Sequence, residues 1–335
     1  MHQHSGGNIE ACLFQVGDLA VASPATVSRC GMVYLEPHQL GWHPLMLSWL
    51  GTLPISIDGQ MKVHLKGLFE WLVSPCLKFI HKNVKEVSQT TDANLVVGLM
   101  RIFYSLIDEF RNEELSKTMG KDKKKIWIDS IFVFSLIWSI GCTGDDDGRK
   151  HFEEFFRQLA TGHTPEGYEI YILCESESLF VDLMPTDDGA TLYDYVFDKG
   201  LSKWMLWTDL IVPVEIPESA NFNEIIIPTK DTLRYTYILN QCIVAEIPML
   251  FVGPTGTGKT IYINEHLINR LSKETYVSVL VCFSARTSAN MTQNQIDGQL
   301  DRRKRGVYGP PLGKRLIIFV DDLNMPQVYY MYLSS

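Results

Sequence analysis

The chain has 335 residues, a length typical of about two domains. Its composition, with 46% hydrophobic and 21% charged residues, is that of a globular protein with a sizeable core. The formal net charge of −9 argues against nucleic acid as the main partner. The seven cysteines form no Cys-x-x-Cys pair, which argues against a zinc site and suits a reducing compartment.

Residues 1–40 begin without a charged segment followed by an apolar one, so we expect no secretory signal. Within them, a short apolar run meets the turn signal Ser23-Pro24. A second short strand is predicted at Met32–Leu35.

Residues 41–160 carry the helical spacing of apolar side chains and predict an all-α subdomain. The pattern is clearest around Leu65–Leu72, Leu95–Phe110, Ser130–Ile140 and Phe152–Leu159. The apolar faces of several such helices bury one another, which is the simplest way to cover them in water.

One apolar stretch, Ile126–Cys142, tests for a membrane span. It is shorter than the roughly 20 apolar residues that a spanning helix needs, and it carries Asp129. We therefore expect a buried helix of the helical subdomain and no membrane partner.

Residues 161–224 are rich in proline and turn signals and predict a connecting segment with a few short strands. Trp204 and Trp207 lie beside an extended stretch, and we interpret them as packing anchors rather than a ligand cage.

Residues 225–335 change to an α/β pattern. Thr229 or Asp231 is predicted to cap a helix that runs to about Ala245. Strands are then predicted at Tyr276–Phe283 and Leu316–Val320, with a helix over Ser284–Leu300 between them. Alternation of this kind predicts a parallel sheet with its ligand at the carboxyl ends of the strands.

The most informative motif lies between a predicted strand, Met249–Val252, and a predicted helix, Ile261–Leu271. It has the form G-x-x-x-x-G-K-T, the phosphate-binding P-loop. Backbone N–H groups of such a loop surround a triphosphate, and the helix N-terminus adds its positive dipole end. We expect ATP or ADP here, with Lys259 on the β- and γ-phosphates and the Thr260 hydroxyl on Mg²⁺. The predicted nucleotide-binding residues are Gly253, Pro254, Thr255, Gly256, Thr257, Gly258, Lys259 and Thr260.

The apolar run Leu316–Val320 ends in Asp321 and Asp322, which is a Walker B pattern. A carboxylate at the tip of a buried strand holds Mg²⁺ directly or through water, so Asp321 is the predicted metal residue. Asp322 stands where a hydrolysing enzyme usually has Glu to polarise the attacking water. Because Asp is one methylene shorter, slow hydrolysis or nucleotide holding is plausible.

A basic tract, Arg302–Arg305, lies before the turn-forming residues Gly306–Pro311. It fits either a nuclear-import or nucleic-acid patch, or an exposed loop tip. The acidic chain and the neighbouring turn residues favour the loop tip.

These motifs together resemble the axonemal dynein heavy chains, the six-module AAA+ ring motors. SPATVSRCGMVY, at Ser23–Tyr34, is similar to the end of the large domain of the second module. Five further stretches resemble the third module and follow its order along the chain. They are IIIPTKDTLRY, VGPTGTGKT, FSARTSANMTQ, LDRRKRGVYGPPLGK and FVDDLNMP. The resemblance implies an incomplete α/β P-loop NTPase (AAA+) large subdomain at 225–335, preceded by an all-α AAA+ small subdomain at 41–160.

The resemblance also implies residue roles. Arg29 matches the arginine finger, which would neutralise transition-state charge on the γ-phosphate in the nucleotide site of the preceding module. Ile227, Pro228 and Thr229 match the segment that packs on adenine.

For function, the resemblance implies a segment of an ATP-driven, minus-end-directed microtubule motor of cilia or flagella, carrying a regulatory ATP site. The implied partners are microtubules, dynein intermediate and light chains through the full-length parent, and neighbouring AAA+ modules. The implied location is the cytoplasm, cytoskeleton and axoneme. Residues 327–335 depart from the family pattern, so a fragment or a short splice form is expected.

Two other functions fit the motifs. One is a nucleotide-binding structural piece without turnover, which the Asp at position 322 favours. The other is an unrelated P-loop enzyme, such as a kinase or a clamp-loader-like ATPase. Whether the chain itself is an ATPase stays open at the level of sequence.

Overall fold

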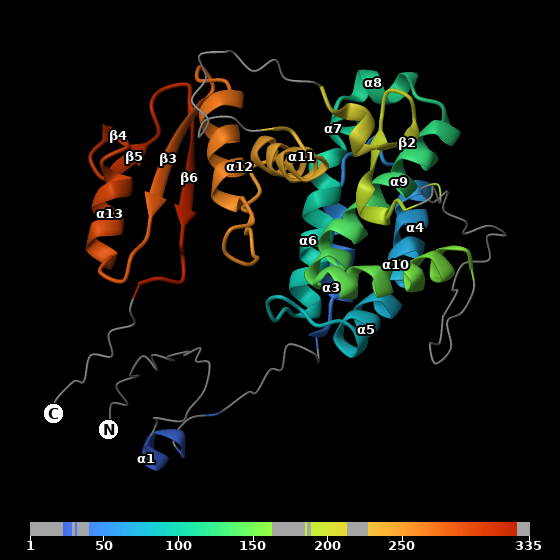
Figure 1. Cartoon of the computed structure of the whole chain (residues 1–335), viewed down its shortest axis with the longest axis horizontal. Coiled ribbons are helices and arrows are strands. Elements are labelled where there is room, and N and C mark those ends of the chain that lie inside the picture. The colour runs from blue at the N-terminus through green and yellow to red at the C-terminus, as the bar shows by residue number, and fades with distance from the viewer. Residues whose placement is uncertain are drawn as a thin grey trace, which may run out of the picture. The chain divides into compact units, whose positions relative to one another are not determined.

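A computed structural model describes residues 23–28, 31, 40–162, 185, 189–212 and 227–326, apart from the side chains of Thr26 and Glu113 (Figure 1). The chain divides into two compact units, Met1–Gly41 and Trp42–Ser335. In the first unit the described residues include one helical turn, α1 (Pro24–Val27), which begins at the predicted turn signal. The strand predicted at Met32–Leu35 lies outside the described residues.

The first part of the second unit is helical as far as residue 162, as predicted. Two of the predicted helices are modified locally. The helix over Leu65–Leu72 passes into a π-helical turn, and the helix over Leu95–Phe110 breaks at Ile107. The helices are α3 (His43–Thr52), α4 (Gly59–Leu68), η1 (Phe69–Val73), α5 (Ser74–Asn83), α6 (Asp92–Leu106), α7 (Asp108–Arg111), α8 (Glu113–Thr118), α9 (Lys121–Ser139), η2 (Gly141–Thr143) and α10 (Asp146–Ala160).

Helix α9 forms the centre of this helical core. Every residue from Trp127 to Ser139 is buried, because the helix is apolar around most of its circumference. The rings of Phe69 and Phe132 meet edge to face with centroids 5.0 Å apart. Among the described residues, the helical stretch Lys121–Thr143 is long and apolar enough to cross a membrane, and 78% of its apolar window is buried. The expected burial of this helix is confirmed.

The buried Asp129 of α9 has a partner on a neighbouring helix. Nε2 of His64 on α4 lies 2.5 Å from Oδ1 of Asp129, and both side chains are largely shielded from solvent. A polar group in such a core is tolerated when it is hydrogen-bonded. The contact therefore explains how an acidic residue is accommodated in an otherwise apolar segment.

The described part of the connecting segment contains a β-hairpin that packs on the helical core. Strands β1 (Tyr195–Asp198) and β2 (Lys203–Leu206) pair antiparallel, between the 3₁₀ turns η3 (Leu192–Asp194) and η4 (Trp207–Leu210). Trp207 is buried and Trp204 packs against the same core, so their role as packing anchors is confirmed.

The C-terminal part has α/β character. Strands β3 (Tyr276–Cys282) and β6 (Arg315–Asp321) pair in parallel, with Cys282 opposite Asp321. The parallel pairing and both strands are as predicted. The helix predicted over Ser284–Leu300 is shorter and starts after its cap, Ser288. The remaining elements are α11 (Lys230–Val244), α12 (Lys259–Glu265), η6 (His266–Arg270), α13 (Ala289–Asp297), β4 (Asp301–Lys304) and β5 (Val307–Gly309).

Two expectations for this part are corrected. The strand predicted at Met249–Val252 is wrong, because this segment forms no ladder with any described strand. Its apolar side chains are left partly uncovered, with Leu250 70% exposed. The basic tract, expected as an exposed loop tip, belongs to a regular hairpin, β4–β5, in which the whole of β4 is exposed as expected.

Helix α11 belongs to two cores at once. Its residues Ile238 and Cys242 are buried in the helical core. Leu239, one position along, is buried in a smaller core with Ile263 of α12 and Leu267 of η6, the helical turns that follow the P-loop. Successive helix positions point about 100° apart, so a single helix can serve both sides. α11 is thus the shared element between the helical and the α/β parts of this unit.

Candidate functional site

The P-loop owes its shape to two glycines in left-handed conformation. Gly256 has φ 84° and Gly258 has φ 81°. This region disfavours residues with a Cβ. At Gly258 a Cβ would also lie 3.0 Å from the ring of Tyr262. Gly258 ends the loop and forms the N-cap of α12, which starts at Lys259.

The Lys259 ammonium is held over the loop by oxygen atoms. It donates to the carbonyl oxygen of Gly253 at 3.0 Å, to that of Pro254 at 2.5 Å and to the Thr257 hydroxyl at 3.2 Å. These are the kinds of contact that a phosphate oxygen can replace. The amine therefore lies where a phosphate in the loop would meet it.

Thr260 and Asp321, predicted from separate motifs, are brought together. The Thr260 hydroxyl donates to Oδ2 of Asp321 at 3.0 Å, joining the first turn of α12 to the end of β6. Both groups supply hard oxygen atoms, the ligand type that Mg²⁺ prefers. The donor set therefore fits a magnesium ion beside the phosphate loop.

Asp322 follows directly and lines the same cleft as Asp321. Its backbone is left-handed, with φ 53°, and its N–H donates to Oδ1 of Asp321 at 3.1 Å. Its carbonyl accepts from the N–H of Met325 at 2.9 Å, which closes a turn. Asp tolerates this conformation better than most residues. The residue is exposed.

A cleft of about 970 Å³ opens next to these residues. Its polar end carries Lys259, Thr260 and Asp321. Its apolar lining comes from the segment 249–252, the strand β6 and the helices α11 and α12. The cleft therefore includes residues of both nucleotide motifs, the P-loop and the Walker B strand.

The predicted adenine-packing residues that the structure describes lie outside the cleft. Ile227 is 67% exposed, and none of the described residues Ile227, Pro228 and Thr229 lines the cleft. Thr229 instead acts locally, because its hydroxyl accepts from the N–H of Thr232 and caps α11. Arg29 lies outside the described residues.

One polar cluster at the start of α11 escaped sequence reasoning. Asp194 at the end of η3 meets Lys230 and Arg234 of α11. The signal available was the pattern Thr191-x-x-Asp194, a capping box, which the structure forms with both of its hydrogen bonds.

Two family models match the chain in succession. Residues 65–209 match the dynein heavy chain AAA lid domain. Residues 214–331 match the P-loop containing dynein motor region. Together with the P-loop geometry and the helical content, these matches assign the chain the AAA+ fold and imply nucleotide binding.

Curated relatives match nearly the whole chain. Dynein axonemal heavy chain 3 of Homo sapiens is 43% identical over 325 residues, which is 94% of this chain and 8% of the relative. Dynein axonemal heavy chain 12 of Mus musculus is 42% identical over 320 residues, covering 94% and 10%. Dynein axonemal heavy chain 1 of Homo sapiens is 40% identical over 321 residues, covering 94% and 7%. The chain therefore spans a tenth or less of the length of these relatives, and it belongs to the axonemal dynein heavy chain family.

Proposed function

We propose that the chain acts as part of an ATP-driven, minus-end-directed microtubule motor and carries one regulatory nucleotide site of it. Membership in the dynein family removes the alternative of an unrelated kinase or clamp-loader-like enzyme. We divide the chain into the end of a second AAA+ large subdomain (1–40), its helical small subdomain (41–160), a connecting segment (161–224) and part of a third large subdomain (225–335).

The observation that carries the proposal is the contact between Thr260 and Asp321. Two motifs 61 positions apart meet at 3.0 Å. Bound Mg²⁺ would neutralise charge on the β- and γ-phosphates. The P-loop backbone, with Gly253–Gly258, would hold the phosphates, and the Thr260 and Asp321 oxygens would hold the metal.

The apolar cleft supports the finer arrangement. The segment 249–252 and the strand β6 both line it, and β6 pairs with β3 on one edge only among the described strands. Parallel sheets are normally covered and paired within the fold. In a longer parent chain, a further strand of the same sheet fits this cleft and completes the third large subdomain.

Binding is tested by titrating the full 335-residue chain with ATP, with and without Mg²⁺. Lys259→Ala should abolish binding. Thr260→Ala and Asp321→Asn should remove only the gain from Mg²⁺. Lys273→Ala, at an exposed lysine of the same α/β part, is the matched control and should behave as the wild type. Wild-type affinity in Lys259→Ala would refute the site.

Nucleotide holding without turnover is the second function, favoured by Asp322. The carboxylate is short and its backbone is held in a tight turn. A general base must come within about 3 Å of the proton it accepts, directly or through one water. Single-turnover hydrolysis by the wild type should be slow, and faster with Asp322→Glu. Fast hydrolysis by the wild type, with no gain in the variant, would contradict this function.

The names of the relatives supply the wider setting. They are axonemal dynein heavy chains, and we place this chain in the axoneme of cilia or flagella as well as the cytoplasm and cytoskeleton. Its partners there would be microtubules, intermediate and light chains, and the neighbouring AAA+ modules. Arg29 would serve the preceding module as arginine finger. In a parent that includes that module, Arg29→Ala should slow hydrolysis there while leaving nucleotide binding intact.

A further inference from the structure

The helix α13 and the hairpin β4–β5 follow one another in the α/β part and bury very little of their own surface (Figure 1). α13 contains no buried residue, and every residue of β4 is exposed. A helix this short is marginally stable in water, and so is a two-stranded hairpin. Packing on a further surface is what usually stabilises such elements. The region therefore has the structural features of a surface that meets a partner.

The hairpin is strongly basic. Residues 301–305 carry four cations and one carboxylate. Arg303 is used within the hairpin itself, because its guanidinium donates to the carbonyl oxygen of Pro310. The other three cations have no hydrogen-bond or ion-pair partner within the part of the chain that the structure describes, and they are Arg302, Lys304 and Arg305.

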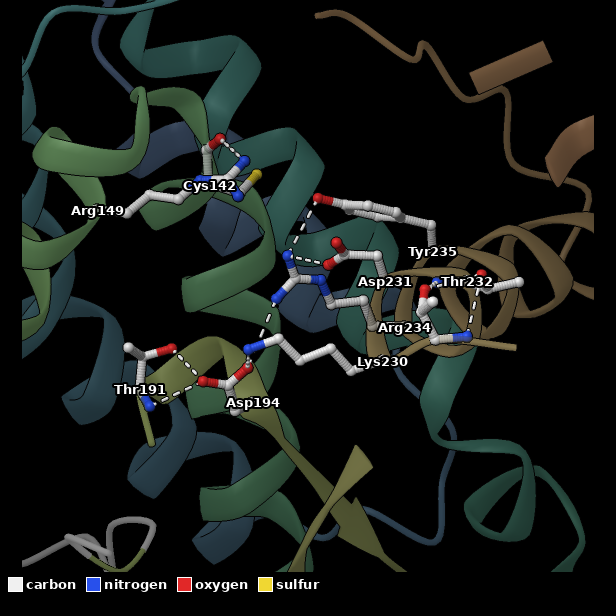
Figure 2. Close-up of polar contacts among 10 residues, drawn as sticks. Cys142, Arg149, Thr191, Asp194, Lys230, Asp231, Thr232, Arg234 and Tyr235 are labelled. Atoms are coloured by element: carbon white, nitrogen blue, oxygen red, sulfur yellow. Dashed lines mark hydrogen bonds and ion pairs between the residues drawn. The ribbon is translucent and has the colours of Figure 1, made fainter. Parts of the chain in front are cut away.

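The start of α11 shows the alternative arrangement, in which cations have partners. There Lys230 and Arg234 both meet the carboxylate of Asp194, and Arg234 also meets Asp231 (Figure 2). Cations that stand close together without such partners repel one another, and the repulsion lowers stability. A ligand that supplies negative charge to the hairpin removes this repulsion, so charge complementarity favours an acidic partner.

Apolar side chains are exposed beside these cations. Tyr308 lies directly opposite Arg302 in the register of the hairpin and is 57% exposed. Leu312, just beyond the hairpin, is 85% exposed, and Met291 of α13 is exposed as well. Tyrosine, methionine and arginine are residue types that are enriched in protein–protein interfaces. The combination therefore fits a polypeptide better than a small anion.

The backbone of the hairpin offers a further means of recognition. Among the described strands, β4 and β5 pair only with each other, so the outer edge of each is open to another strand. An extended peptide can pair with such an edge, and its alternate side chains then meet those of the hairpin. Cations at the edge repel a second copy of the same hairpin but accept an acidic strand.

We propose that the hairpin β4–β5, with the neighbouring α13, is a docking surface for an acidic, extended polypeptide segment. The segment pairs through its backbone with an edge of the hairpin. Its carboxylates meet Arg302, Lys304 and Arg305, and its apolar side chains pack on Tyr308 and Leu312. The proposal is independent of nucleotide binding, because none of these residues lines the cleft beside the P-loop.

The experiment measures the affinity of the full chain for a labelled synthetic peptide by fluorescence anisotropy. The peptide consists of about four Glu-Val repeats, which is within the length of an ordinary strand. The variant Arg302→Glu/Lys304→Glu/Arg305→Glu should bind it at least about tenfold more weakly, because three exposed ion pairs become repulsive.

Two control variants should bind the peptide as the wild type does. Lys121→Glu/Lys123→Glu/Lys125→Glu makes the same change of charge at three exposed lysines in the first turns of α9. Acidic residues are favourable at a helix N-terminus, so this variant should fold. Lys259→Ala removes nucleotide binding, which plays no part in peptide binding.

The mode of binding is tested separately from the charge. A peptide of Glu-Gly repeats carries the same charge but has no apolar side chains and little tendency to form a strand, so it should bind more weakly. Tyr308→Ser should weaken binding of the Glu-Val peptide while keeping the three cations. Hydrogen exchange of residues 301–309 should slow when the Glu-Val peptide is bound, because an edge of the hairpin is then paired.

Four results would overturn the proposal. Wild-type affinity in the hairpin charge variant would remove these cations as the binding groups, and an equal loss in the α9 variant would mean that only total charge matters. Equal affinity for the Glu-Gly peptide would remove the apolar contacts and the strand pairing. A single-stranded oligonucleotide of the same charge that bound as tightly as the Glu-Val peptide would make the hairpin a nucleic-acid patch. If hydrogen exchange of β3 and β6 shows that the charge variant does not fold, Tyr308→Ser decides in its place, and unchanged affinity there counts against the surface.

Discussion

The helical and the α/β parts of the second unit differ sharply in how much of their apolar surface is covered. In the helical part, α9 alone buries every residue from Trp127 to Ser139. The separate core of the α/β part consists of four buried residues, Leu239, Ile263, Leu267 and Leu271. Meanwhile Leu250 and Val252 beside the P-loop are 70% and 53% exposed.

The two parts therefore depend on different sources of stability. Burial of apolar surface is the main favourable term in folding, and it is plentiful in the helical part. The α/β part has little of it, so its order depends more on what binds there and on helix α11. Regions with few buried apolar contacts open at low free energy, and sites that respond to ligands are drawn from such regions.

The two parts can be followed separately. All seven tryptophans, from Trp42 to Trp207, lie in the helical part and the hairpin packed on it, so tryptophan fluorescence reports on that part. Hydrogen exchange of β3 and β6 reports on the α/β part.

The largest expected loss of stability comes from making a cavity in the helical core. Phe132 is fully buried against Phe69, so Phe132→Ala should lower the free energy of unfolding by about 3–5 kcal/mol. The matched change in the other part, Leu250→Ala, removes a mostly exposed side chain and should cost about 0.5 kcal/mol or less. Urea unfolding measures both. If the two variants lost similar free energies of unfolding, the two parts would not differ in how much their apolar packing stabilises them.

The next largest effect on stability should come from nucleotide binding to the α/β part. A ligand that binds only the folded state at a hundred times its Kd adds about 2.7 kcal/mol of stability. MgATP should therefore slow hydrogen exchange in β3 and β6 strongly, while the tryptophan transition moves less. Lys259→Ala is the control and should show no protection. Equal protection of both parts would mean that α11 couples them into one cooperative unit.

Much of the fold and of the candidate site was predictable from the sequence. The P-loop and Walker B motifs each depend on a short run of residues, and their meeting at Thr260 and Asp321 follows from the α/β pattern. The prediction of a strand at 249–252 was wrong because an apolar run becomes a strand only where neighbouring strands offer backbone partners. The contact between Asp194 and Lys230 spans 36 positions and depends on packing, which local patterns do not encode.

A smaller effect is expected from the buried polar pair of the helical part. His64→Leu leaves the Asp129 carboxylate without its partner in the core, which should cost about 1–3 kcal/mol. The double variant His64→Leu/Asp129→Leu should regain part of this loss, because no charge is then left unpaired. His81→Leu breaks a similar but exposed pair with Asp92 and should cost less than about 1 kcal/mol. Unfolding followed by tryptophan fluorescence measures these losses. If His81→Leu lowered the free energy of unfolding as much as His64→Leu, the prediction would be wrong.

The smallest effect is a pH dependence confined to the α/β part, where His266 is the one histidine between residues 227 and 335. Burial lowers the pKa of His266, the charge of Arg270 lowers it further, and Glu265 opposes both. Because the folded state binds this proton less readily than the unfolded state, the stability contribution of the neutral ring is present above the ordinary pKa of about 6.5. It is lost as the pH falls from there through the lower pKa of the folded state.

Incubation at about pH 7.5 and about pH 5.5, on either side of that ordinary value, followed by exchange labelling at one fixed pH, should show β3 and β6 opening more readily after the acidic incubation. His266→Leu should remove that difference. A pH response that persists in this variant would place its origin outside His266.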